Sequence, residues 1–100
     1  MGTRERGLSL RLFVAGDSPN SASAIANLKA LFPKSETSNV EMEIVDVERE
    51  PARAARDGIM VTPTLLKLSP APRCRILGNL KNRAALLHLL GIDLPRPDPN

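Results

Sequence analysis

The first regular pattern along the chain is an alternation of apolar and polar residues over residues 8–15. Successive side chains of a strand point to opposite faces of a sheet, so this two-residue period predicts a β-strand. Phe13 adds apolar surface to the second face, which indicates a strand near the middle of the sheet. Residues 40–47 alternate and then become apolar on both faces, and they predict a second strand. The apolar face of the first strand consists of Leu8, Leu10, Leu12 and Val14.

A helical spacing of apolar residues separates these two strands. The turn before it holds Gly16, a hydroxyl at Ser18 that can accept N–H groups of a helix end, and Pro19, whose fixed φ suits a first helical position. We therefore expect a helix that begins near Pro19 and stops at Pro33. Its apolar stripe is predicted to comprise Ala22, Ile25, Leu28 and Phe32.

The next elements are a short helix and a β-hairpin. Pro51 opens a segment rich in Ala and Arg, and Gly58 can adopt the left-handed conformation that commonly ends a helix. Residues 64–68 are mostly apolar and residues 73–77 alternate, with a proline-rich turn between them. This arrangement predicts two antiparallel strands.

The last element is a helix over residues 82–90, which Asn82 can cap and Gly91 can end. The predicted order is therefore β-α-β-α-β-β-α, an α/β fold with a mixed four-stranded sheet. The first crossover is expected to be right-handed between parallel strands. This layout is the thioredoxin-like arrangement. The stripe of the last helix is predicted to comprise Leu86, Leu87, Leu89 and Leu90.

Composition limits the chain to one domain and excludes several function classes. Of its 100 residues, 42% are hydrophobic and none is Trp or Tyr, so bases cannot stack on those rings and nucleic acid is not an expected partner. The net charge of +3 is scattered among acids, which favours solubility and mild attraction to acidic partners. No apolar run approaches the roughly 18 to 20 residues that span a bilayer, and no leader pattern precedes the first strand, so we expect a cytoplasmic protein. We assign 1–7 to a flexible N-terminus, 8–92 to the domain and 93–100 to a disordered proline-rich tail.

The redox chemistry of thioredoxin-like enzymes is not expected here. Those enzymes carry Cys-x-x-Cys at the start of the first helix, where the helix N-terminus lowers the thiol pKa. Residues 16–21 hold no cysteine, and the hydroxyls of Ser18 and Ser21 do not replace a dithiol. The lone Cys74 lies on the strand face of Ile76 and is interpreted as a buried structural thiol; the alternative is a perturbed thiol between two arginines.

No metal or cofactor site is predicted. His88 is the only histidine, has no second ligand at metal spacing and is interpreted as part of a solvated helix face. Gly16 belongs to no phosphate-binding pattern and is interpreted as a turn glycine. Acidic side chains that follow the second strand are interpreted as a solvated loop; they are Asp46, Glu48 and Glu50.

Two further features of the sequence are a proline before the third predicted strand and a set of basic residues on the predicted sheet. Pro63 stands where thioredoxin-like folds hold a proline before a strand, usually in cis, although a plain strand-starting proline is the alternative. A set of basic residues is expected to share one side of the sheet and to bind an acidic protein surface, the alternative being a merely solvated face. These residues are Arg6, Arg11, Lys67, Arg73 and Arg75.

Several stretches resemble the KaiB family of small clock proteins from cyanobacteria and their wider bacterial relatives. The resemblance covers most of residues 8–90 with its spacing kept. The matching stretches are residues 12–21, 44–47 followed by Pro51, 59–65 and 75–83.

The resemblance implies a non-enzymatic regulator that binds the ring of the ATPase KaiC and, in the full oscillator, helps to sequester KaiA. It marks Asp57, Lys67 and Arg75 as the best candidates for contact with a KaiC-type ring. Glu43 stands where relatives often carry Lys, a charge reversal on the strand that meets KaiA. A related thioredoxin-like sensor domain occurs in the kinase SasA, so an adaptor or sensor for a histidine kinase is the alternative. A thiol-dependent, thioredoxin-like enzyme is a less favoured alternative.

The resemblance also implies a choice between two folds, because the family has a tetrameric ground-state fold and a monomeric thioredoxin-like fold that binds KaiC. Leu89 occupies the place of a Gly in relatives that rest as tetramers, and Gly91 then falls at the helix end. Leu is a far better helix former than Gly. We therefore predict the monomer, with a hairpin over 64–68 and 73–77 and a helix over 82–90.

Overall fold

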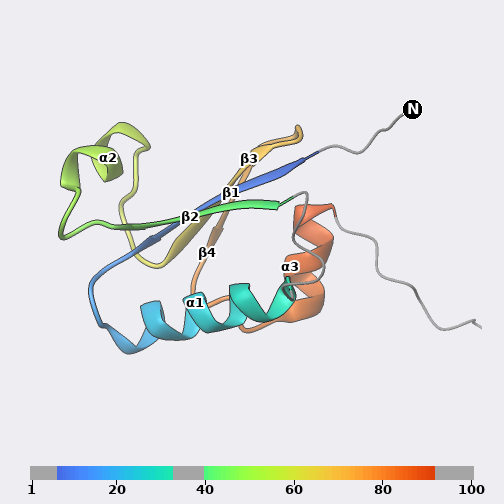
Figure 1. Ribbon diagram of the computed structural model, residues 1–100, viewed down its shortest axis with the longest axis horizontal. Helices are drawn as coiled ribbons and strands as arrows, with labels where there is room; N and C mark the ends of the chain where they lie inside the picture. The colour runs from blue at the N-terminus through green and yellow to red at the C-terminus, as the bar shows by residue number, and fades with distance from the viewer. Residues whose placement is uncertain (1–6, 33–39, 92–100) are drawn as a thin grey trace, which may run out of the picture.

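The computed structural model describes residues 7–32 and 40–91, and these contain four strands and three helices (Figure 1). Arg6, Pro33 and the predicted tail 93–100 lie outside the described residues. The elements in chain order are β1 (Leu8–Val14), α1 (Pro19–Leu31), β2 (Val40–Asp46), α2 (Pro51–Arg56), β3 (Thr64–Ser69), β4 (Cys74–Leu77) and α3 (Arg83–Leu90).

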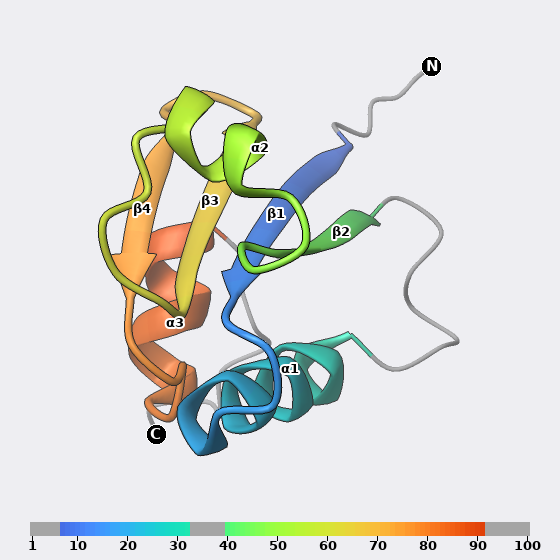
Figure 2. The same cartoon turned by 90° about the vertical axis from the view of Figure 1, so that its left-hand side faces the viewer.

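The strands form one mixed sheet in the order β2-β1-β3-β4 (Figure 2). β1 pairs in parallel with β2, and β3 pairs in antiparallel with both β1 and β4. The thioredoxin-like fold class predicted from the sequence is therefore confirmed. β1 is a central strand with buried residues on both faces, Leu10 and Leu12 on one and Phe13 on the other, as the apolar Phe13 indicated.

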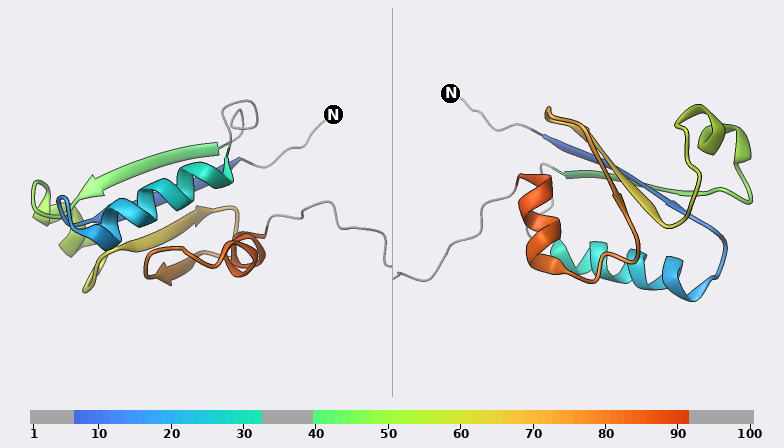
Figure 3. Two further views of the ribbon diagram at one scale, coloured as in Figure 1. Left: turned by 90° about the horizontal axis from the view of Figure 1, so that it is seen from below. Right: turned by 180° about the vertical axis from the view of Figure 1, so that it is seen from behind.

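The helices cover opposite faces of this sheet. Figure 3 shows α1 and α3 on one face and α2 on the other, and we name these the α1/α3 face and the α2 face. The larger apolar core lies on the α1/α3 face, where Leu10, Leu12 and Leu65 are at most 1% exposed. A smaller cluster on the α2 face consists of Phe13, Val45, Ala54 and Leu66. Each fully buried large side chain contributes on the order of 1.5–3 kcal/mol to folding.

The start of α1 is fixed by two serines. The Ser18 hydroxyl accepts the N–H of Ser21 at 3.3 Å, and the Ser21 hydroxyl accepts the N–H of Ala15 at 3.0 Å. Ser21 is completely buried, and both its hydroxyl and its N–H have a hydrogen-bond partner. The predicted stripe is wrong at Ala22, which is exposed, whereas Leu28 is buried and Ile25 and Phe32 are half-buried. The buried face consists of Ser21, Ala24, Leu28 and Leu31.

The last helix agrees with its predicted caps. The Asn82 side chain accepts the N–H of Ala85 at 3.0 Å, and Gly91 has the left-handed φ of 75° that ends many helices. The predicted stripe is wrong at Leu89, which is 49% exposed, while the other three leucines are buried. The Leu89 side chain is therefore free of the core, although its main chain continues α3.

The peptide bond between Thr62 and Pro63 is cis, as predicted, and Pro63 is buried where the chain enters β3. The peptide bonds before Pro70 and Pro72 are cis as well. None of the helices within residues 7–32 and 40–91 has the length and apolarity required to cross a bilayer.

Candidate functional site

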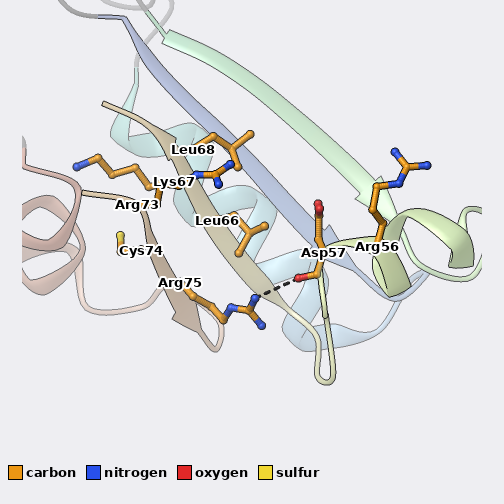
Figure 4. Close-up of a pocket in the computed structure, with 8 residues that line it drawn as sticks. All are labelled: Arg56, Asp57, Leu66, Lys67, Leu68, Arg73, Cys74 and Arg75. Atoms are coloured by element: carbon orange, nitrogen blue, oxygen red, sulfur yellow. Dashed lines mark hydrogen bonds between the residues drawn. The ribbon is translucent and has the colours of Figure 1, made fainter. Parts of the chain in front are cut away.

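A cavity of about 480 Å³ opens on the α2 face between the end of α2 and the β3–β4 hairpin (Figure 4). α2 has only six residues and covers only part of this face, so the hairpin beyond it remains accessible. We name this cavity the basic groove. Its lining residues are Arg56, Asp57, Leu66, Lys67, Leu68, Arg73, Cys74 and Arg75.

The floor and one wall of the basic groove follow from strand register. Leu66 pairs with Arg11 on β1 and with Arg75 on β4, and paired residues of neighbouring strands project to the same face. Leu68, two residues farther along β3, projects to that face as well. The groove therefore has an aliphatic floor with guanidinium groups beside it.

Arg75 ties β4 to the end of α2. Its Nη1 donates to the carbonyl oxygen of Gly58 at 2.9 Å, and its Nη2 donates to that of Asp57 at 3.1 Å. The last carbonyl groups of a helix lack partners within the helix, so these bonds stabilise the segment that follows α2. Within the described residues, neither Arg56 nor Arg73 takes part in an ion pair, and both are exposed.

Arg11 lies in a network of ion pairs beside the groove. It donates to Glu43 and to Asp57, each at 2.9 Å. Arg53 lies 2.6 Å from the other oxygen of Glu43 and 3.5 Å from Glu50. Two carboxylates of the same molecule therefore already pair with Arg11, and contact of Arg11 with a partner stays a prediction.

The network shifts the pKa values of Glu43, Arg11 and Arg53. The hydrogen bond from Arg53, followed by that from Arg11, lowers the pKa of Glu43 to about 2 from an ordinary 4.5. The Asp57 bond, followed by the Glu43 bond, raises the pKa of Arg11. The Glu43 bond likewise raises the pKa of Arg53. These directions keep Glu43, Arg11 and Arg53 charged throughout the physiological range.

Lys67 lines the basic groove, but its side chain does not project to the α2 face with the arginines, so its predicted placement is wrong. It pairs with Leu10 and Cys74, which project to the α1/α3 face, and it is only 4% exposed. Its ammonium lies 3.6 Å from the position that a Cβ would take on Gly91, and it points away from Asp57 (Figure 4). The buried ammonium therefore faces the carbonyl end of α3, where the helix dipole favours a cation.

Two further residues considered in the sequence analysis, Cys74 and His88, lie outside the set of arginines on the α2 face. Cys74 shares a face with Ile76, as predicted, but it is half-buried rather than buried, with its Sγ 3.6 Å from the carbonyl oxygen of Leu89. His88 is exposed, as predicted. Among the described residues, no group of three or more His, Cys, Asp and Glu side chains is arranged to hold a metal ion.

The turn between β1 and α1 is closed by an acidic side chain. Asp46 accepts the N–H of Glu48 at 2.9 Å and that of Gly16 at 3.1 Å, and these bonds, in that order, lower its pKa. Gly16 has a φ of +52°, and a Cβ there would meet the Glu48 carboxylate at 2.8 Å. Asp46 therefore has a structural role rather than the purely solvated one predicted, and Gly16 is required as a turn glycine.

Sequence reasoning missed two arginines and three apolar residues of this surface. Arg53 follows Glu50 by three residues on a helix, a spacing that favours an ion pair and was available as a signal. Arg56 follows Arg53 by the same spacing, but nothing local to it indicates the groove. The exposed apolar residues are Met60, Val61 and Leu77.

The fold and the start of α1 together define the class of this protein. It is a thioredoxin-like α/β domain in which Ser18 and Ser21, not a pair of cysteines, hold the N-terminus of the first helix. The accessible chemistry lies instead on the α2 face, where arginines surround an aliphatic floor. Such a surface is suited to binding.

Comparison with known proteins gives the family. The KaiB domain model matches residues 11–92, so the chain belongs to the KaiB family. The circadian clock protein KaiB3 of Synechocystis sp. is 41% identical over 85 residues, which is 85% of this chain and 81% of that protein. The circadian clock oscillator protein KaiB of Thermostichus vulcanus is 40% identical over 85 residues, or 85% of this chain and 77% of that protein.

Solved structures share the fold at lower identity. The N-terminal domain of SasA from Synechococcus elongatus has a TM-score of 0.67 and 22% identity, covering 89% of this chain and 85% of that domain. Thioredoxin from Fasciola hepatica has a TM-score of 0.69 and 22% identity, covering 87% of this chain and 81% of that thioredoxin. At these identities the similarity supports the thioredoxin-like fold alone.

Proposed function

We propose that this chain is a non-enzymatic regulator that acts in the cytoplasm by binding a KaiC-type ATPase ring through its α2 face. The observation that carries the proposal is the basic groove, in which Arg56 and Arg73 are exposed outside the ion-pair network of Arg11 and Glu43. Membership of the KaiB family supplies the class of partner.

The charge distribution on the α2 face favours an acidic partner surface. Arg75 uses only part of its hydrogen-bonding capacity on the α2 end, since a guanidinium carries five N–H groups and two of its bonds are accounted for. Guanidinium groups bind carboxylates in a planar, bidentate geometry. Asp57 is already bonded to Arg11, so it contributes to the shape of the groove rather than an open negative charge.

The test is the affinity of the full chain for a purified KaiC-type ATPase ring, measured with Arg73→Glu combined with Arg75→Glu. We expect the double variant to bind at least about 10-fold more weakly, and the wild type to lose affinity as salt rises, because exposed charges are screened over about 8 to 10 Å. Arg83→Glu is the matched control, since Arg83 is exposed at the start of α3. Equal affinity of all three proteins would contradict the proposed interface.

The non-enzymatic part of the proposal has its own test. Without a dithiol at residues 16–21, we expect no reduction of insulin above background in the presence of a dithiol reductant. Turnover that Cys74→Ser abolishes would assign a thiol activity to this chain.

A contact with KaiA through β2 is not part of the proposal. Glu43, the residue with reversed charge on that strand, is held by Arg11 and Arg53. Its carboxylate is therefore engaged within the molecule.

A second candidate function is that of a sensor or adaptor for a histidine kinase. The observation that favours it is the similarity to the SasA N-terminal domain, which covers 89% of this chain. Pull-downs with the tagged chain against KaiC-type ATPases and histidine kinases of the same cell separate the two. Capture of a kinase without an ATPase ring would favour the second candidate.

A further inference from the structure

Three apolar side chains are exposed beside the basic groove. Met60 is 89% exposed, Val61 is 51% exposed and Leu77 is 60% exposed. Exposed large apolar residues that cluster together mark interaction surfaces more often than single ones do.

Two hydrogen bonds and the strand register bring Val61 and Leu77 to one end of the hairpin, and Met60 precedes Val61 in the chain. Leu77 pairs with Thr64, and the Thr64 hydroxyl donates to the carbonyl oxygen of Val61 at 2.7 Å. The N–H of Gly78 donates to the carbonyl oxygen of Pro63 at 3.0 Å. The segment before β3 and the end of β4 therefore form one continuous surface.

This apolar end continues the basic groove along β4. Arg75 and Leu77 alternate on the α2 face, and Arg73 lines the same groove one step earlier. Alternate residues of a strand lie about 7 Å apart, so the three side chains form a row. We name this row, with Met60 and Val61 beside it, the β4 stripe.

The edge position of β4 leaves the stripe accessible from the side. In the described sheet, β4 has β3 on one side and no strand on the other. Arg73 and Leu77 are exposed, and Arg75 is exposed despite its bonds to the segment after α2. A partner segment can therefore lie along the whole row.

We propose that the β4 stripe binds an extended acidic segment of the partner, in which two carboxylates at alternate positions precede or follow one apolar residue. The carboxylates face Arg73 and Arg75, and the apolar side chain packs on Leu77 and Met60. This inference rests on the proposed function, because it specifies what the α2 face recognises. A second copy of this chain is disfavoured as the occupant, because the partner surface would bring the same arginines against one another.

Because the stripe ends in apolar side chains, it requires an apolar residue in the bound segment as well as carboxylates. A merely basic surface would bind any acidic segment and would not respond to the loss of Leu77. A stripe that reads both chemistries discriminates against acidic segments without the apolar residue, since specificity is a difference between affinities.

The experiment compares Leu77→Ser and Met60→Ser with Leu89→Ser, whose leucine is 49% exposed on α3 and lies outside the stripe. One probe is the KaiC-type ATPase ring. The second is a synthetic peptide of alternating aspartate and serine that ends in leucine, next to the same peptide ending in serine. Circular dichroism checks that each variant is folded.

We expect Leu77→Ser and Met60→Ser each to weaken ring binding at least about 5-fold, while Leu89→Ser binds like the wild type. We expect the leucine peptide to shift the amide resonances of residues 73–77 more strongly than the serine peptide. Ring binding that survives both stripe variants but not the arginine reversals would overturn this inference and leave the proposed function intact. Binding of the leucine peptide on the stripe without binding of the ring would support the recognition of such a segment and would overturn the proposed function. Concentration-dependent self-association lost in Leu77→Ser would assign the stripe to a second copy and also overturn the inference.

Discussion

Arg75 donates a hydrogen bond to the main-chain carbonyl oxygen of Asp57 at 3.1 Å, while the carboxylate of the same Asp57 accepts from Arg11 on β1 at 2.9 Å. One residue at the end of α2 therefore links the central strand of the sheet to its edge strand. Because Asp57 and Arg75 both line the basic groove, these bonds fix part of its wall.

Replacing Arg75 is expected to loosen the segment that follows α2. Arg75→Ala removes two hydrogen bonds to main-chain carbonyl groups, and a net loss of about 1 kcal/mol corresponds to roughly 5-fold faster local opening. Hydrogen exchange at the amides of Gly58 and Ile59, which bond to α2 carbonyl groups, measures this opening. Arg73→Ala is the matched control. Equal exchange in both variants would mean that Arg75 does not hold the segment.

Glu43 is expected to make stability depend on pH at the acidic end. Its folded pKa of about 2 lies below the ordinary 4.5, so it stabilises the folded state above pH 4.5, and this contribution is lost as the pH falls toward 2. Exposed ion pairs contribute about 0.2–1 kcal/mol each. In urea unfolding near pH 7, the wild type is expected to have a higher free energy of unfolding than Glu43→Gln. This difference is expected to disappear as the pH falls toward 2. A difference of constant size would contradict the assignment.

Lys67 is expected to tolerate loss of its charge but not its reversal. Lys67→Met keeps the unbranched stem and removes a buried ammonium, so the free energy of unfolding is expected to stay the same within about 1 kcal/mol or to rise. Lys67→Glu buries an unpaired carboxylate beside the negative end of α3 and is expected to cost more than about 3 kcal/mol. Denaturant midpoints measure both. A milder effect for Glu than for Met would mean that this side chain is accessible.

The chain is expected to be a monomer with the hairpin and α3 as the populated arrangement in solution. Leu89→Gly is expected to weaken α3 by about 0.8 to 1.0 kcal/mol, because Gly is that much poorer than Ala in a helix while Leu is close to Ala. Light scattering gives the mass, and backbone chemical shifts give the secondary structure. A tetramer with helix across residues 64–77 and a strand near the C-terminus would contradict this prediction.

The fold could be predicted from the sequence because its elements depend on local patterns. The two-residue period of residues 8–15 predicts β1 because successive side chains of a strand project to opposite faces of the sheet. The caps of α3 are local too, since Asn82 and Gly91 act within one turn of the helix. The buried face of α1 was missed because Ser21 is polar by type, and only its bonds to Ser18 and Ala15 make it suitable for the core.

The site depends on register and on long-range partners, which a single sequence does not give. Lys67 faces away from Arg75 because it pairs with Cys74, and that pairing is set by the path of the turn between β3 and β4. Arg11 is neutralised by Glu43 and Asp57, which are 32 and 46 residues away along the chain. The resemblance to a family indicated three of the groove residues, Asp57, Lys67 and Arg75, without indicating how they are held.

The central claim is that the α2 face is the surface that meets the partner ring. Hydrogen exchange of the full chain, measured with and without a saturating KaiC-type ATPase ring, tests it most directly. We predict added protection at the end of α2, in the segment with Met60 and Val61, and along β4, with little change in α1. Protection confined to α1, or no protection at a ring concentration that binds the chain, would contradict the claim.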